Sequence, residues 1–306
     1  MRDKDVFKRQ AGLLIAVVPY LKHGACFALH GGTAINMFYR DMPRLSVDID
    51  LTVTDKGPRR QALETISSGL KAVASAVKKG IPGSVVQELK GADDGLVKKL
   101  FVRSGGVSVK IEPNQVIRGT LEQPLEMELC SSAQAEFEKY AAVTAVSFAE
   151  VYGSKICAAL DRQHPRDLFD IMLLLENEGI TEKIRKVFLV FLISHNRPMA
   201  ELLKPNLKDL RAVYEREFEG MTSISVSHER LSETRNSLIK KINGEMTDKE
   251  RKFLLSFKNM APEWELLGTE GAGGMPAVKW KLENLAKMKS EKHKNSADEL
   301  KKILGI

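Results

Sequence analysis

The sequence predicts an α/β (α+β) fold in which a mixed-sheet domain is followed by a helical domain. Up to about residue 129, several segments alternate apolar and polar residues with the period of two that strands show. From residue 147 onward the apolar pattern changes to the helical period and keeps it. We therefore place the domain boundary within residues 131–146, which gives domains of residues 1–146 and 147–306.

The first domain is predicted to contain one sheet with covering helices. Between residues 61 and 79, apolar residues from Leu63 to Val77 recur at helical spacing, which is typical of a helix packed on a sheet. In chain order we expect a helix over 5–22, strands over 25–29 and 46–54, the helix over 61–79, strands over 85–89, 97–102 and 107–112, and a last strand over 124–129.

The second domain is predicted to be helical throughout. Ser147 and Glu150 have the spacing of a capping box, which begins a helix that runs to about Arg162. Pro165 suits the first turn of the next helix, where its missing N–H costs nothing. The glycine-rich stretch 268–274 lacks the Lys-Ser/Thr of a phosphate-binding loop, so we expect a flexible connection. Further helices are expected to open at Thr181 and at Thr247 with Glu250.

Composition indicates a globular protein with an anionic partner. Of 306 residues, 28% are charged and 43% hydrophobic, which is ordinary for a folded chain and excludes wholesale disorder. The net charge of +7 and the pI of about 9.1 favour a partner such as RNA or nucleotide.

The same sequence predicts a cytoplasmic protein without a membrane segment. The charged N-terminus, Met1 to Asp5, lacks the apolar core of a signal peptide. No apolar run approaches the length needed to span a bilayer. Cys26, Cys130 and Cys157 are scattered and form no Cys-x-x-Cys, which favours a reducing compartment and argues against structural zinc.

Two aspartates on one predicted strand form the first candidate site. In the alternating run 46–54, Asp48 and Asp50 face the same way, opposite Ile49 and Leu51. Asp is a poor strand former, and two of them side by side repel each other unless a cation lies between them. Carboxylates, usually one or two together with phosphate oxygens, are the ligands that Mg²⁺ prefers. We therefore predict a magnesium site; the alternative is an exposed sheet face with two solvated acids.

A Gly-Gly turn precedes this strand. Gly31 and Gly32 follow the apolar run 25–29 and allow a positive φ and close backbone approach. A helix that starts at Thr33 would present free N–H groups to phosphate oxygens. The Thr33 hydroxyl would either join that phosphate cradle or cap the helix.

A third carboxylate is expected on a later strand. In the run 107–112, Val109 and Ile111 point to one face and Lys110 and Glu112 to the other. If this strand pairs beside residues 46–54, Glu112 is placed to be a third metal ligand. The alternative is a surface strand with a Lys/Glu face.

Basic residues on the helix after Ser147 form the second candidate site. Lys155 and Arg162 are seven residues apart, so they share one helix face two turns apart. Composition alone favours a solvated basic face here. Asp167 lies in the first turn after Pro165, where the helix dipole favours a carboxylate. Asp170 can pair with Arg166 at i, i+4, but we predict a functional role for it.

These motifs together resemble a known enzyme superfamily. Gly31 to Ala34, followed by Arg-Leu-Ser-Val-Asp-Ile-Asp-Leu over 44–51, resembles the DNA polymerase β-like nucleotidyltransferases, and within them the AbiEii-type toxins of bacterial toxin–antitoxin and phage-abortive systems. The helix 155–162, the Arg-Asp-Leu-Phe-Asp run 166–170 and a tryptophan helix over 276–285 follow in that family's order.

The resemblance implies roles for individual residues. It implies that the Asp-x-Asp pair binds two Mg²⁺ ions, with Glu112 as the acid on the neighbouring strand. Lys155 would contact nucleotide phosphate with Arg162 in support, and Asp170 would act near the transferring group. The implied nucleotide-binding residues are Gly31, Gly32, Thr33, Ser46, Lys155 and Arg162, and the implied catalytic residues are Asp48, Asp50, Lys155 and Asp170.

We therefore predict a nucleotidyltransferase toxin that moves NMP from an NTP to RNA, with the 3′ end of tRNA as the acceptor. The lysines after Trp280 favour RNA, or they belong to a solvated helix. Transfer to a protein side chain and a regulator that binds nucleotide without transfer are the alternatives. The resemblance also implies an antitoxin partner.

Overall fold

The computed structural model describes residues 4–306; Met1 to Asp3, which belong to the charged N-terminus discussed above, lie outside them. The chain divides into two compact units. The first runs to Val151 and includes Phe218–Ser225, and the second comprises Tyr152–Glu217 and Val226–Ile306. Helix α5 (Phe148–Arg162) spans the boundary between them.

In the first unit, the described residues form one mixed sheet, as the sequence predicted, and it has seven strands where the sequence predicted six. The strand order is β3-β4-β5-β2-β1-β7-β6. The pairs β2–β5 and β1–β7 are parallel and the other neighbours are antiparallel. The strands are β1 (Phe27–His30), β2 (Asp48–Val53), β3 (Val85–Lys90), β4 (Val97–Ser104), β5 (Val107–Pro113), β6 (Leu125–Glu128) and β7 (Ala142–Ala145).

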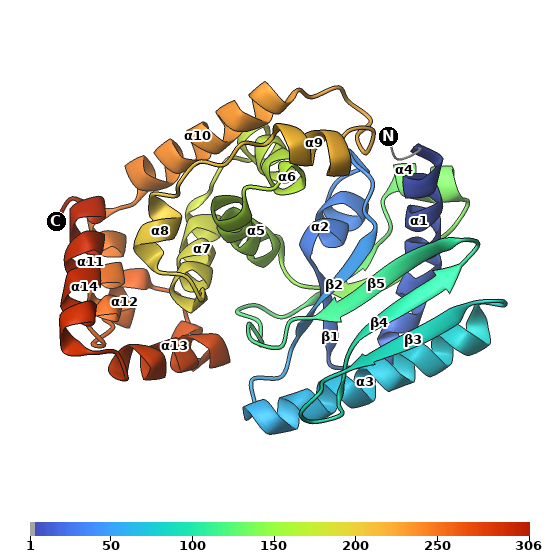
Figure 1. Ribbon diagram of the computed structural model, residues 1–306, viewed down its shortest axis with the longest axis horizontal. Helices are drawn as coiled ribbons and strands as arrows, with labels where there is room; N and C mark the ends of the chain where they lie inside the picture. Colours follow the sequence, from blue (N-terminus) through green and yellow to red (C-terminus); the bar gives the residue numbers. More distant parts are fainter. Residues whose placement is uncertain (1–3) are drawn as a thin grey trace. The chain divides into compact units, whose positions relative to one another are not determined.

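The sheet has one apolar and one polar face across β2, β4 and β5. Ile49, Val109 and Ile111 are fully buried, because side chains on one strand face recur every second residue. Helices α1 (Lys4–Val17) and α3 (Arg59–Gly80) pack on this part of the sheet (Figure 1). The other face presents half-buried polar side chains, and it holds the predicted carboxylates.

The stretch 131–146 contains structure that the sequence analysis did not predict. Helix α4 (Ser131–Phe137) is followed by β7, so β6 is not the last strand. Strand β7 has four residues and lies between β1 and β6. Such a short strand gives too few residues for an alternating pattern to stand out, and its position depends on pairing with distant partners.

A late segment of the chain returns to the first unit. Leu45 N donates to Met221 O at 2.8 Å, and Ser223 N donates to Pro43 O at 3.1 Å. These backbone bonds attach residues 218–225 to the loop that leads into β2. The attachment steadies the entrance to the strand that carries the aspartates.

The second unit is helical in its described residues, as predicted. Thr181 caps α7 through Ile184 N, and Thr247 with Glu250 forms a complete capping box on α11. The helices after α5 are α6 (Pro165–Glu176), α7 (Glu182–Ser194), α8 (Met199–Leu203), α9 (Arg211–Glu217), α10 (His228–Glu245), α11 (Asp248–Lys258), α12 (Trp264–Leu267), α13 (Pro276–Ala286) and α14 (Ser290–Leu304) (Figure 1).

The glycine-rich stretch 268–274 is a structured turn rather than the flexible connection that we expected. Gly268 ends α12 in a left-handed conformation, and a 3₁₀ turn covers Ala272–Gly274. Ala272 is fully buried, and a Cβ at Gly273 would come within 3.0 Å of the Trp264 ring. Packing against this ring orders the turn. Among the described residues, no helix is long and apolar enough to cross a membrane.

Candidate active site

Strand β2 carries Asp48 and Asp50 on its polar face. Ile49, which lies between them, is fully buried, so both aspartates point to the opposite, half-buried side. In the parallel pairing with β5, Asp48 lies opposite Lys110 and Asp50 lies opposite Glu112. The sheet thus brings the third predicted carboxylate next to the first two.

The Gly-Gly turn lets two side chains lie directly against the backbone. Gly31 has a φ of +69°, a backbone conformation that residues other than glycine rarely adopt. A Cβ at Gly31 would lie 2.5 Å from Asp50 Oδ2, and one at Gly32 would lie 2.6 Å from Arg44 Nη2. Both glycines therefore make room for charged groups, a carboxylate in one case and a guanidinium in the other.

The helix after this turn begins earlier than predicted. Helix α2 (Gly31–Ala34) starts at Gly31, and not at Thr33, and continues into a π-helical turn over Ile35–Tyr39. His30 is the N-cap, because its Nδ1 accepts a hydrogen bond from Gly31 N at 2.6 Å. This bond makes Nδ1 the unprotonated ring nitrogen and fixes the start of the helix.

The Thr33 and Ser46 hydroxyls are engaged within the protein. Thr33 Oγ1 donates to the backbone O of Asp48 at 2.5 Å and lies 2.7 Å from Ser46 Oγ. Because each hydroxyl carries one proton, Ser46 is the donor in the second bond. Both residues are buried, at 1% and 5% exposure. In this arrangement the two hydroxyls tie α2 to the first residue of β2, and their predicted contact with nucleotide stays a prediction.

Glu112 on β5 accepts from two lysines. Lys110 Nζ lies 2.8 Å from Oε2, and the ammonium of Lys99 on β4 pairs with Oε1. Burial opposes ionisation of Glu112, but the hydrogen bonds and charges of both lysines outweigh it and lower the pKa of the carboxyl. Burial also opposes the charge on Lys110, yet Glu112, Asp48 and Asp50 raise the pKa of its ammonium. The face therefore carries charges of both signs.

In the second unit, Lys155 is a buried cation between two carboxylates. Its Nζ lies 2.8 Å from Asp167 Oδ1 and 3.2 Å from Asp170 Oδ2. The exposures of Lys155, Asp167 and Asp170 are 5%, 1% and 0%. Burial favours the neutral form of Asp167, but the charges of Lys155 and Arg162 prevail and hold the pKa of that carboxyl well below its usual range.

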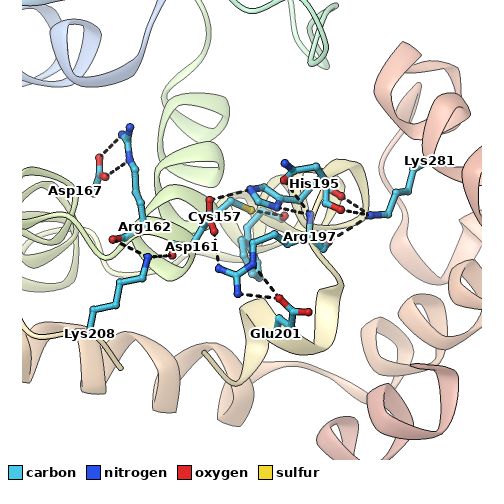
Figure 2. A network of polar contacts seen from close by, with 11 residues as sticks. Cys157, Asp161, Arg162, Asp167, His195, Arg197, Glu201, Lys208 and Lys281 are labelled. Carbon is cyan, nitrogen blue, oxygen red and sulfur yellow. Dashed lines mark hydrogen bonds and ion pairs between the residues drawn. The ribbon is translucent and has the colours of Figure 1, made fainter. Parts of the chain in front are cut away.

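Arg162 reaches the same carboxylate from the other side. Its Nε donates to Asp167 Oδ2 at 2.6 Å and its Nη2 to Oδ1 at 2.9 Å, a bidentate pair (Figure 2). Arg162 stays 61% exposed at its side chain, whereas Asp167 is buried. Lys208 Nζ donates to the carbonyls of Asp161 and Arg162, where α5 ends. A cation is favoured there by the helix dipole.

A sharp turn between α5 and α6 brings the carboxylates to Lys155. Gln163 adopts a φ of +52°, unusual for a residue with a side chain. Its amide holds the conformation by bonding to Asn206 O, Lys208 N and Arg235 Nη1. His164 then caps α6 by accepting from Arg166 N, the capping role that its position next to the motif helix favours.

The structure gathers the predicted residues into one group in each unit. The first group contains Gly31, Gly32, Thr33, Ser46, Asp48, Asp50 and Glu112, and the second contains Lys155, Arg162 and Asp170. Sequence reasoning missed two central residues: Asp167, which joins Lys155 to Arg162, and Arg44, which is 3% exposed against Gly32. Both stand inside the quoted motifs, where a charge opposite in sign to that of the predicted site residues was the available signal.

The carboxylates on β2 are ligands of the kind that Mg²⁺ prefers, and the described residues alone do not complete a metal site. Asp48 and Asp50 share one half-buried face, and Gly31 leaves the space that the Asp50 carboxylate occupies. Residues 4–306 contain no group of three or more His, Cys, Asp or Glu side chains placed to hold a metal. Mg²⁺ is commonly held by one or two carboxylates together with phosphate oxygens and water. A metal here would need such additional oxygens.

Comparisons with known proteins identify the family. A family model described as "Nucleotidyl transferase AbiEii toxin, Type IV TA system" matches residues 13–284. Among solved structures, the chain is similar to MenT4, nucleotidyltransferase toxin Rv2826c from Mycobacterium tuberculosis H37Rv, with a TM-score of 0.60 and 14% sequence identity over 94% of this chain and 96% of that chain. At that identity the likeness shows a shared fold. The search of curated proteins finds no match. Because the family match spans most of the chain and includes both groups of motif residues, the protein belongs to the AbiEii family of nucleotidyltransferase toxins of type IV toxin–antitoxin systems.

Proposed function

We propose that this nucleotidyltransferase uses two Mg²⁺ ions to transfer NMP from an NTP to RNA, with the 3′ end of tRNA as the acceptor. The observation that carries the proposal is the pair Asp48 and Asp50 on one half-buried strand face, against a Gly-Gly turn that leaves room for a carboxylate. A protein that only bound nucleotide would not need two acids at this position.

Asp48 and Asp50 are proposed to hold the metal ions. When bound, Mg²⁺ neutralises charge on the phosphate oxygens and orients the attacking and departing oxygens. The backbone N–H groups of Gly32 and Thr33 are proposed to bind the triphosphate, while the Thr33 hydroxyl keeps Asp48 in place. Catalysis then rests on positioning and on charge neutralisation.

Lys155 and Asp170 are proposed to serve the reaction from the second unit, as the family's motifs imply. The two carboxylates around Lys155 fix its position at low exposure. A lysine held in this way loses little conformational freedom when it meets a phosphate group. Arg162, which is more exposed, supports it through Asp167.

The acceptor proposal rests on the charge of the C-terminal region. Residues 276–306 contain eight lysines and four acidic residues, a net charge of +4 out of the chain's +7. Trp280 on α13 is 46% exposed and offers a ring on which a base can stack. Six lysines that follow Trp280 are exposed to solvent: Lys287, Lys289, Lys292, Lys294, Lys301 and Lys302.

The direct test incubates the protein with each labelled NTP and either total tRNA or a cytosolic protein extract. We expect label on tRNA, a requirement for Mg²⁺, and loss of labelling in Asp48→Asn. Label that goes only to protein would refute the RNA acceptor and favour modification of a protein side chain. Absence of label from both acceptors would refute transfer.

A second test concerns the basic region. Replacing Lys287, Lys289, Lys292 and Lys294 by Gln should weaken tRNA binding and reduce the slope of log affinity against log salt by up to about 3, because each phosphate contact contributes roughly 0.7–0.9. A matched variant replaces four exposed lysines of the first unit, Lys71, Lys78, Lys79 and Lys90, by Gln. Equal salt slopes in the two variants would contradict a specific RNA-binding role of the C-terminal region.

The toxin assignment is tested in cells. Expression of the chain alone should arrest growth in a way that depends on Asp48, and a separately encoded antitoxin should relieve the arrest. Growth at the normal rate with the active wild-type enzyme would argue against toxicity. We also propose a cytoplasmic location, which suits the three cysteines, all free in the structure.

A further inference from the structure

The polar face of the sheet contains a trio of charged residues that the proposed reaction has not used. Lys99, Lys110 and Glu112 come from the neighbouring strands β4 and β5. One carboxylate serves both ammonium groups, with Lys110 on Oε2 and Lys99 on Oε1. The trio therefore keeps a net charge of +1.

The sheet register places this trio beside the aspartates. Because β2 and β5 are parallel, Lys110 lies opposite Asp48 and Glu112 lies opposite Asp50. Neighbouring strands of a sheet lie about 4.7–4.9 Å apart in the hydrogen-bonding direction. Asp48, Asp50, Lys110 and Glu112 all alternate with buried residues, so they share one face.

The two ammonium groups are both fixed and accessible. The side chains of Lys99 and Lys110 are 33% and 31% exposed, so solutes can reach them. An ammonium group has three N–H donors, and Glu112 accepts from one donor of Lys99 and one donor of Lys110. Lys98, which precedes Lys99 on β4, instead pairs one-to-one with Asp94 near a turn. Glu112 thus holds both Lys99 and Lys110, whereas Lys98 has a carboxylate of its own.

We propose that Lys99 and Lys110, held in place by Glu112, form a phosphate-binding subsite beside Asp48 and Asp50. The inference rests on the proposed function of the same face. Phosphate oxygens would accept the N–H donors that Glu112 leaves over, and the phosphate comes either from the NTP or from the RNA backbone. Glu112 is then a positioning residue for the two lysines, in place of the third metal ligand that the sequence suggested.

The test measures binding by the full-length protein and its variants Lys99→Gln, Lys110→Gln, the double variant and Glu112→Gln. Lys98→Gln is the matched control, because it removes the same charge from the same strand at a lysine that pairs with Asp94 and not with Glu112. The probes are inorganic tripolyphosphate, each of the four NTPs, total tRNA, and Mn²⁺ alone. Far-UV circular dichroism checks the fold.

We expect the double variant to lose at least about tenfold in phosphate affinity, since a hydrogen bond to a charged group contributes that much or more. Weaker binding of tripolyphosphate and NTPs with unchanged tRNA binding assigns the subsite to the NTP. The reverse pattern assigns it to RNA. If every probe binds the double variant as it binds Lys98→Gln, the subsite does not exist.

Glu112→Gln separates a positioning role from a metal-ligand role. We expect Mn²⁺ affinity close to wild type together with weaker phosphate binding, because the lysines lose their anchor. A loss of Mn²⁺ affinity as large as that of Asp50→Asn would overturn the positioning role. The transfer activity of the wild-type protein is measured separately. If the wild type is inactive but the double variant still binds phosphate more weakly, the proposed function is refuted and the phosphate-binding subsite is retained.

Discussion

Replacing Asp167 by Asn tests the claim that this residue organises the second unit. The substitution keeps the size of the side chain and removes its charge. Asp170 is then the one carboxylate left beside Lys155, with its Oδ2 3.2 Å from Lys155 Nζ. Both residues are buried, at 5% exposure for Lys155 and 0% for Asp170. Arg162, whose side chain is 61% exposed, can turn to water.

The expected cost follows from these exposures. Removing one partner of a buried ion pair costs about 3–5 kcal/mol, and the remaining carboxylate should reduce this to about 2–3 kcal/mol. Arg162→Gln is the matched control, because it removes the exposed partner of the same carboxylate. A pair with an exposed partner contributes about 0–1 kcal/mol, so this variant should unfold close to wild type.

Urea unfolding followed by tryptophan fluorescence reports on the right part of the chain. The chain has two tryptophans, Trp264 and Trp280, and both belong to the second unit. With a slope of about 1–3 kcal/mol per molar urea, Asp167→Asn should lower the midpoint by about 0.7–3 M. A midpoint equal to that of Arg162→Gln would refute the reasoning, because Asp170 alone would then suffice for Lys155.

Three further predictions follow from the two charged groups. Asp48→Asn or Asp50→Asn should reduce nucleotidyl transfer by at least about a hundredfold with an unchanged far-UV circular dichroism spectrum. Even residues that only hydrogen-bond to a metal ligand contribute about 10–100-fold to metal affinity or activity. Full activity in excess EDTA would contradict the metal role. Gly31→Ala and Gly83→Ala each place a side chain at a positive φ, +69° and +74°, at a cost of about 1–2 kcal/mol. The new methyl group meets Asp50 in Gly31→Ala, whereas it enters open space in Gly83→Ala. Only Gly31→Ala should therefore lose transfer activity, and equal losses in the two variants would contradict the close contact with Asp50. The pKa of Asp167 is lower in the folded chain than its ordinary 3.8, so the stability that this residue provides is present above pH 3.8 and is lost as the pH falls toward the folded pKa. Between about pH 5 and about pH 3, the urea midpoint should therefore fall more in the wild type than in Asp167→Asn. Equal falls in the two proteins would contradict this assignment.

The sequence by itself determined the features that depend on residues near each other in the chain. The alternation around Ile49 predicted that Asp48 and Asp50 share a face, and the structure shows it, because strand geometry alone sets that orientation. The capping box at Thr247 and Glu250 likewise predicted where α11 begins. The family resemblance, carried by the same local motifs, agrees with the family match over residues 13–284.

Tertiary structure decided which distant charges meet. No local pattern shows that Glu112 is shared by Lys99 and Lys110, since this depends on the pairing of β4 with β5. The return of residues 218–225 to the first unit was invisible for the same reason.

Asp167 shows the limit most clearly. By position it was a first-turn acid that the helix dipole would favour, as its neighbours in sequence suggested. Its partners Lys155 and Arg162 reach it across the turn at Gln163, and that turn is held by hydrogen bonds from residues more than forty positions away. The energy of a buried charge depends on all the groups around it, and only the folded chain determines which groups those are.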